Sequence, residues 1–249
     1  MLQNRPARTD IAGAGRAELR IRAGALAAGA ALLASLGAAC SSGKPANAQS
    51  LLSSAKATLD NTPSAHFTLS STNATTSGGT TITGGQGDMQ RPDKLKGSLD
   101  VVVRGVNASV QVVAVGDQVY AKLPFAATFS KIDPSTFGLG NPSQMFDPSS
   151  GLSTLLSVAS GAKVTGQERI NGELVDEVSA TVPGSAVPVL PDANPSAPVR
   201  LVAAIDPGNH QLRRVTLTGP FVKANASSTF TLTLTSYGEK VQITLPPAS

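Results

Sequence analysis

Apolar and polar residues alternate along most of the chain after Ala65, with the period of two that is typical of antiparallel strands with one buried and one exposed face. In the segment Ser98–Arg104, for example, Leu99, Val101 and Val103 share one face. The alternation predicts ten strands, over Ala65–Thr72, Thr80–Gln90, Ser98–Arg104, Ala108–Val115, Gln118–Leu123, Gly172–Val182, Val199–Asp206, Gln211–Thr218, Ser228–Ser236 and Lys240–Leu245.

Two segments have helical spacing instead, with apolar residues three and four positions apart. The first predicts a helix over Asn47–Asp60, and Pro63 ends it. The second predicts a helix that begins with Asp147 as its N-cap and ends at Gly161 as its C-terminal cap. The apolar stripes of the two helices are Leu51, Leu52, Ala55 and Leu59, and Leu152, Leu155, Leu156 and Ala159.

Short connections join the predicted strands. The segments Val115–Gln118 and Asp206–His210 have the composition of hairpin turns. The Pro-rich stretch Val182–Val199 is too interrupted for a regular strand and predicts an irregular flap. Many antiparallel strands with two or three helices predict an α+β fold, as a single domain over residues 50–249.

The N-terminus carries the features of a secretory leader. Five arginines precede the uncharged segment Ala23–Ala39, whose 17 residues fall short of the roughly 20 that a membrane-spanning helix needs. Leu36–Cys40 resembles a bacterial lipobox, which makes residues 1–39 a lipoprotein signal peptide and Cys40 the lipidated first residue of the mature protein. Residues 40–49 then form a lipidated cysteine with a polar tether, and the protein sits on the outer face of the cell membrane. A cysteine placed there by chance is the alternative.

Charge and reactive residues narrow the function classes. The 20 Lys and Arg and 16 Asp and Glu of the chain fall to 15 and 14 without the leader, a net charge of +1 that gives no reason to expect nucleic-acid binding. The two histidines, His66 and His210, have neither metal-ligand spacing nor a nucleophile beside them. We therefore expect no enzyme activity, no metal site and no cofactor.

The composition leaves the interior open to two interpretations. The chain has no Trp, seven Phe and two Tyr, and large aromatic side chains normally fill much of a core. A sheet lined with medium-sized aliphatic side chains could curl around an unfilled hollow, or it could be a fully packed sandwich.

Five segments along the chain carry a resemblance to a known family. They read DQVYAKL (117–123), FDPSSGLSTLL (146–156), VTGQERINGE (164–173), DPGNHQLRRV (206–215) and SYGEKVQITLPPAS (236–249). In order and spacing they resemble the mycobacterial LppX/LprA/LprF/LprG lipoprotein family, and within it the LprG branch most. Tyr237 and the Pro-rich flap depart from the family pattern.

The resemblance implies a curved antiparallel half-barrel whose helices close an apolar cavity, with a LolA/LolB-like outline. Members of the family carry acylated lipids such as phosphatidylinositol mannosides, lipoarabinomannan, triacylglycerol or phthiocerol dimycocerosates. An LprG-like member is expected to work with a major-facilitator efflux pump of the inner membrane. The implied function is a membrane-anchored lipid carrier; a scaffold lipoprotein that partners a transporter is the alternative.

Shared strand parity, taken with the family picture, selects candidate lipid-binding residues. Each could equally be ordinary core. They are Leu99, Val101, Val103, Val110, Val112, Val119, Ala121, Leu123, Val178, Ala180, Phe230, Leu232 and Leu234.

Overall fold

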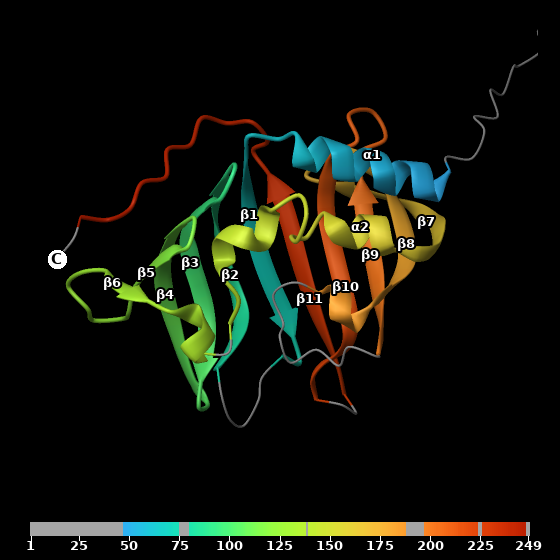
Figure 1. The fold of residues 1–249 in the computed structure, drawn as a ribbon. Coiled ribbons are helices and arrows are strands. Elements are labelled where there is room, and N and C mark those ends of the chain that lie inside the picture. Colours follow the sequence, from blue (N-terminus) through green and yellow to red (C-terminus); the bar gives the residue numbers. More distant parts are fainter. Residues whose placement is uncertain (1–46, 75–79, 138, 188–196, 224–225, 248–249) are drawn as a thin grey trace, which may run out of the picture. The chain divides into compact units, whose positions relative to one another are not determined.

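The computed structural model describes residues 47–74, 80–137, 139–187, 197–223 and 226–247. All belong to one compact unit, Gly43–Ser249. Among them, eleven strands form one antiparallel, unclosed and curved sheet in the order β6-β5-β4-β3-β2-β1-β11-β10-β9-β8-β7 (Figure 1). The strands are β1 Ser64–Thr72, β2 Thr80–Gln90, β3 Lys94–Val103, β4 Val106–Val115, β5 Gln118–Lys122, β6 Ser130–Ile132, β7 Ser160–Ile170, β8 Glu173–Pro183, β9 Pro198–Ile205, β10 Leu212–Lys223 and β11 Ala226–Thr235.

β1 and β11, the first and last strands in sequence, pair at the middle of the sheet and join its two halves. β1 pairs with β11, which sets Leu69 opposite Leu232 and Phe67 opposite Leu234. Buried and less buried residues alternate along β11, as the sequence pattern predicts, because Phe230, Leu232 and Leu234 face the interior between threonines. The predicted α+β class and antiparallel half-barrel are confirmed.

Helices cover one face of the sheet unevenly (Figure 1). They are α1 Ala48–Asp60 and α2 Thr154–Val158, with three short 3₁₀ helices, η1 Pro134–Phe137, η2 Pro142–Phe146 and η3 Gly184–Ala186. The first predicted helix is confirmed: the Asn47 side chain caps α1 by accepting a hydrogen bond from the Gln49 N–H at 3.1 Å. Its apolar stripe packs against α2, β7, β9 and β10.

The second predicted helix is wrong in its extent. Only Thr154–Val158 is α-helical, and Asp147 does not cap it. The Asp147 carboxylate instead accepts hydrogen bonds from the backbone N–H groups of Ser149 and Ser150, both at 2.8 Å. Such a side chain-to-backbone turn competes with helix formation, so the segment after Asp147 turns before the helix begins.

The structure differs from the sequence pattern at three further places. Gly161 was predicted to cap a helix but lies inside strand β7. This edge strand has no buried residue, so its sequence shows no alternation of apolar and polar positions. The short strand β6 also carries too few residues for a pattern. Residues 240–245 form no strand, although Ile243 is buried and its N–H bonds to the Gln90 side chain.

The connections match the sequence pattern better. A tight turn joins β4 to β5, with Gly116 at a φ of 58° that glycine adopts without strain. The Asp206 carboxylate accepts a hydrogen bond from the Gly208 N–H at 2.7 Å in the turn between β9 and β10. Residues 188–196 of the predicted Pro-rich flap lie outside the described residues.

Candidate functional site

An apolar cavity lies on the helix-covered side of the sheet, between two separate hydrophobic clusters. The larger cluster holds the stripe of α1 and residues of β1 and β8–β11, and the smaller holds residues of β2–β5. The cavity has a volume of about 1030 Å³, its open mouth included. Its lining is Leu69, Ile82, Leu99, Val112, Val119, Ile132, Pro134, Phe137, Leu139, Gly140, Pro142, Met145, Leu152, Val187, Val215, Leu217, Phe230 and Leu232.

The hollow follows from where the helices sit. α1 and α2 pack over β7–β10, so their apolar side chains fill that half of the concave face. In the described part of the chain, the β3 and β4 half is contacted mainly by the short helix η2, and η1 lies at the cavity beside it. A five-residue 3₁₀ helix carries too few side chains to fill the space that the curved sheet encloses, so part of the inward surface of β2–β5 faces the cavity.

The chemistry of the lining is uniform. Every lining residue named above is aliphatic, aromatic, Met, Pro or Gly, so none offers a polar side chain to the interior. Water needs two to four polar partners to be stable in a cavity, and these side chains supply none. The space is suited to an apolar occupant such as an alkyl chain.

The opening of the cavity is marked by exposed lining residues. Phe137, at the end of η1, lines the cavity and is 47% exposed, and Gly140 is also partly exposed. Other lining residues, such as Leu232 and Val215, are buried. Within the described residues, the mouth therefore lies beside η1.

The structure distributes the thirteen predicted residues over four environments. Five line the cavity: Leu99, Val112, Val119, Phe230 and Leu232. Three more, Val101, Val110 and Ala121, are buried in the smaller cluster that forms one cavity wall. Three others, Val178, Ala180 and Leu234, are buried in the larger packed cluster and not at the cavity.

The remaining two predicted residues need correction. Val103 is 39% exposed and Leu123 is 59% exposed, and neither lines the cavity. Val103 is the last residue of β3, and Leu123 follows the end of β5. Parity assigns a face only where a strand continues into the covered part of the sheet, and both residues lie at a strand end.

Several lining residues are not among those predicted from the sequence. Leu69, Val215 and Leu217 lie in predicted strands, and their alternation with polar neighbours could have identified them. The segment that contains η1 and η2, residues 134–146, forms a further wall of the cavity, called here the 3₁₀ wall. Its lining residues, among them Phe137 and Met145, have no periodic pattern in the sequence. Their position depends on how that segment folds back over the sheet.

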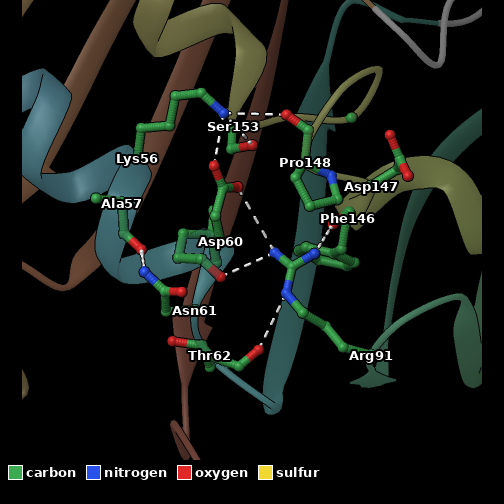
Figure 2. A network of polar contacts seen from close by, with 12 residues as sticks. Lys56, Ala57, Asp60, Asn61, Thr62, Arg91, Phe146, Asp147, Pro148 and Ser153 are labelled. Atoms are coloured by element: carbon green, nitrogen blue, oxygen red, sulfur yellow. Dashed lines mark hydrogen bonds and ion pairs between the residues drawn. The ribbon is translucent and has the colours of Figure 1, made fainter.

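A polar network fixes the 3₁₀ wall to the end of α1 (Figure 2). The Arg91 guanidinium, in the turn between β2 and β3, donates hydrogen bonds to three backbone carbonyls: Leu59 at 2.8 Å, Thr62 at 3.1 Å and Phe146 at 2.5 Å. Arg91 is thus bonded both to the last turn of α1, where unpaired carbonyls favour a cation, and to the last residue of η2.

Charged side chains complete this network. Lys56 forms an ion pair with Asp60 at 2.6 Å and donates to the Pro148 carbonyl at 3.0 Å. Asp60 lies 3.8 Å from Arg91. Burial lowers the pKa of Arg91, while the charges of Asp60 and Asp147 raise it, and a guanidinium stays protonated throughout. The network is therefore a structural clamp on the cavity wall.

Other kinds of site are not found among the described residues. No three His, Cys, Asp or Glu side chains gather there in a way that could hold a metal ion. No helix in the described ranges is long and apolar enough to cross a membrane. Cys40, predicted to carry the lipid, lies outside them.

Comparison with known families decides the relationship of this chain. The profile of the LppX_LprAFG lipoprotein family matches residues 47–243, which contain every element of the sheet and the whole cavity lining. The chain belongs to the LppX_LprAFG lipoprotein family. The resemblance inferred from the sequence is thereby confirmed.

Members of the LppX_LprAFG family with known names or structures resemble this chain over most of its length. "Lipoarabinomannan carrier protein LprG" of Mycobacterium tuberculosis is 29% identical over 237 residues, which cover 90% of this chain and 95% of that protein. LprF from Mycobacterium bovis has a similar fold, with a TM-score of 0.63 and 16% identity over 83% of this chain and all of the solved chain. LppX from Mycobacterium tuberculosis superposes with a TM-score of 0.58 and 22% identity, over 79% and 98% of the two chains.

Proposed function

We propose that this protein is a non-enzymatic carrier of acylated lipids and that the acyl chains of its cargo occupy the cavity. The observation that carries the proposal is a space of about 1030 Å³ with an entirely apolar lining. The LprG relatives, which are named lipoarabinomannan carriers, support a glycolipid or a related acylated lipid as cargo.

The energetics explain why such a lipid needs a carrier. A triacylated lipid with about 15 methylenes per chain has about 45 such groups, and at about 0.8 kcal/mol each their exposure to water costs on the order of 36 kcal/mol. Contact with the cavity wall offsets this cost in proportion to area, so selection acts on chain number and volume. A sugar or phosphate headgroup, as in phosphatidylinositol mannosides or lipoarabinomannan, stays in water at the mouth beside η1.

The proposal includes the membrane anchor and the route of the cargo. Lipidation of Cys40 holds the carrier at the outer face of the cell membrane, and the residues between Cys40 and α1 act as a tether. From there the carrier moves lipid across the cell envelope, with a major-facilitator efflux pump as its partner. Mass spectrometry of the mature protein tests the anchor: a diacylglyceryl mass on Cys40, lost in Cys40→Ala, is expected.

The cargo is tested by extracting the protein, purified without its acyl anchor, with organic solvent and identifying lipids by mass spectrometry. We expect di- or triacyl lipid from the unchanged protein and little from Leu99→Trp, whose indole enters the cavity. Val103→Trp is the matched control, because it lies on the same strand, outside the cavity and 39% exposed. Val119→Phe repeats the test with a fully apolar side chain.

The outcomes separate a carrier from a scaffold. A folded Leu99→Trp protein that has lost its lipid, beside a Val103→Trp protein that retains it, supports the carrier. Unfolding of both Leu99→Trp and Val119→Phe would mean that the space is solid core, because overpacking a filled core is destabilising. An unchanged protein that yields no lipid would leave the scaffold role in its place.

A further inference from the structure

The connection between β5 and β6, residues 123–129, contains Phe125, the most exposed large hydrophobic residue of the described structure. Its sequence, LPFAATF, has no charged residue. Phe125 is fully exposed, Leu123 is 59% exposed, and Pro124 and Ala127 are exposed as well. Figure 1 shows the connection extending beyond the sheet at its β6 edge. An uncharged, protruding group of this kind marks an interaction site.

The backbone holds Phe125 outward. Phe125 has a φ of 68°, in the left-handed region that a bulky residue rarely adopts, and the turn is closed by a hydrogen bond from the Ala126 N–H to the Leu123 carbonyl at 3.1 Å. This conformation costs free energy and buries none of the Phe125 ring in the protein. The arrangement therefore favours an occupant that comes from outside the protein.

Charges at the base of the connection point to the kind of occupant. Lys122 and Lys131 flank it on β5 and β6, while Asp133 is the nearby acid at the far end of β6. Hydrogen bonds from the Ser135 hydroxyl and N–H lower the pKa of Asp133, so this carboxylate stays ionised. An apolar tip between two lysines matches the boundary between the acyl chains and the anionic headgroups of a bilayer.

The position of the connection relative to the cavity strengthens this match. β6 has three residues and is about 10 Å long. The connection precedes β6, and η1, whose Phe137 stands at the cavity mouth, follows it. A tip inserted in a bilayer would hold the mouth close to the bilayer surface, where a lipid has the shortest path through water.

We propose that residues 123–129 form a membrane-contacting loop, in which Leu123 and Phe125 insert into the surface of a phospholipid bilayer beside the cavity mouth. Insertion transfers the exposed Phe125 ring from water to an apolar environment, and it places Lys122 and Lys131 at the level of the lipid headgroups. The contact does not depend on which lipid the cavity carries. It differs from the Cys40 anchor because it orients the domain and does not merely tether it.

The absence of tryptophan from the chain gives a direct test. Phe125→Trp in the full chain places a single fluorophore at the tip of the loop, and Leu174→Trp is the matched control. Leu174 is 42% exposed at the start of β8, which pairs with β7 at the opposite edge of the sheet. Each variant is measured with vesicles of phosphatidylcholine and phosphatidylglycerol, with and without bromine-labelled acyl chains.

We expect vesicles to shift the emission of the Phe125→Trp variant to shorter wavelength, and bromine-labelled chains to quench it, while the emission of the Leu174→Trp variant changes little. Any tether at the N-terminus is common to both variants, so it cannot produce the difference. Unchanged emission of the Phe125→Trp variant with vesicles would overturn the proposal and leave the loop to a protein partner. Equal quenching of the two variants would overturn it too. Since the measurement needs no cargo, an empty cavity in the extraction experiment leaves its outcome intact.

Discussion

Leu232 and Leu234 lie two residues apart on β11, point to the same face of the sheet and belong to the same hydrophobic cluster, but of the two only Leu232 also lines the cavity. Leu232 is opposite Leu69 on one side and Val215 on the other, and all three line the cavity. Leu234 is opposite Phe67, whose ring packs 5.9 Å from that of Phe146. Leu234 has no exposed surface and belongs to the packed cluster. The pair compares the same substitution at a hollow and at a filled position.

The expected cost of each Leu→Ala change follows from this difference. At Leu234 the loss includes both the transfer of the deleted groups and a new cavity in a packed core, about 3–5 kcal/mol in all. At Leu232 the void already faces part of the side chain, and atoms without partners lose no contacts. The transfer of about three methylene equivalents, roughly 2 kcal/mol, is then most of the cost. We expect a difference of about 2 kcal/mol between the two variants.

Urea unfolding of lipid-extracted protein, followed by far-ultraviolet circular dichroism, measures this difference. Tryptophan fluorescence is not an option, because the chain has none. A gap of about 2 kcal/mol corresponds to melting temperatures about 4–8 °C apart for a domain of this size. Lipid must be removed first, since a bound ligand stabilises the folded state. Equal losses at the two positions would refute the reasoning, because Leu232 would then be as tightly packed as Leu234.

Three further results are expected. Replacing Arg91 with Met removes the donor of three hydrogen bonds to backbone carbonyls. The free energy of unfolding, measured by denaturant titration, should therefore fall by about 3 kcal/mol or more. A loss below about 1 kcal/mol would show that the Arg91 network is dispensable. Burial raises the pKa of Tyr237, whose hydroxyl donates to the Leu212 carbonyl. The neutral phenol therefore stabilises the fold fully below the unfolded-state pKa of about 10, and this stabilisation is lost as pH rises above that value. Tyr237→Phe should flatten the resulting alkaline decline in melting temperature, and an unchanged slope would contradict the assignment. Hydrogen bonds from Ser149 lower the pKa of Asp147 to about 2. The Asp147 carboxylate therefore stabilises the fold above about pH 4, and this stabilisation is lost as pH falls towards about 2. Asp147→Asn should remove this part of the dependence of melting temperature on pH, and a variant that keeps the original dependence would argue against it.

Local patterns in the chain predicted the parts of the fold that depend on neighbours in sequence. Alternation identified β11 and most other strands, because a sheet with one covered face demands a period of two. The apolar stripe of α1 was equally clear, since it depends on residues within a few turns of one another. The pattern failed where solvent surrounds a strand, as in the edge strand β7, and where a side chain turns the backbone, as at Asp147.

The cavity lining was predictable only in part, for a different reason. Parity selected the inward face of β3, β4, β5 and β11, and five lining residues came from that selection. Parity cannot tell Leu232 from Leu234, because both are inward-facing leucines on one strand. The difference lies in what sits above them, and that element comes from elsewhere in the chain.

The amino-acid pattern alone was enough to predict an antiparallel sheet with one buried face, an amphipathic N-terminal helix and a resemblance to the LppX_LprAFG lipoprotein family. The hollow inside the sheet depends on tertiary packing, which strand patterns do not record. The alternation along a strand predicts which side chains are shielded from water. A side chain in a packed core and one that lines an apolar cavity are both shielded, so the pattern does not distinguish them. Whether a partner fills the opposite side depends on the reach of α1 and on the short η1 and η2 segments, the second of which Arg91 clamps in place.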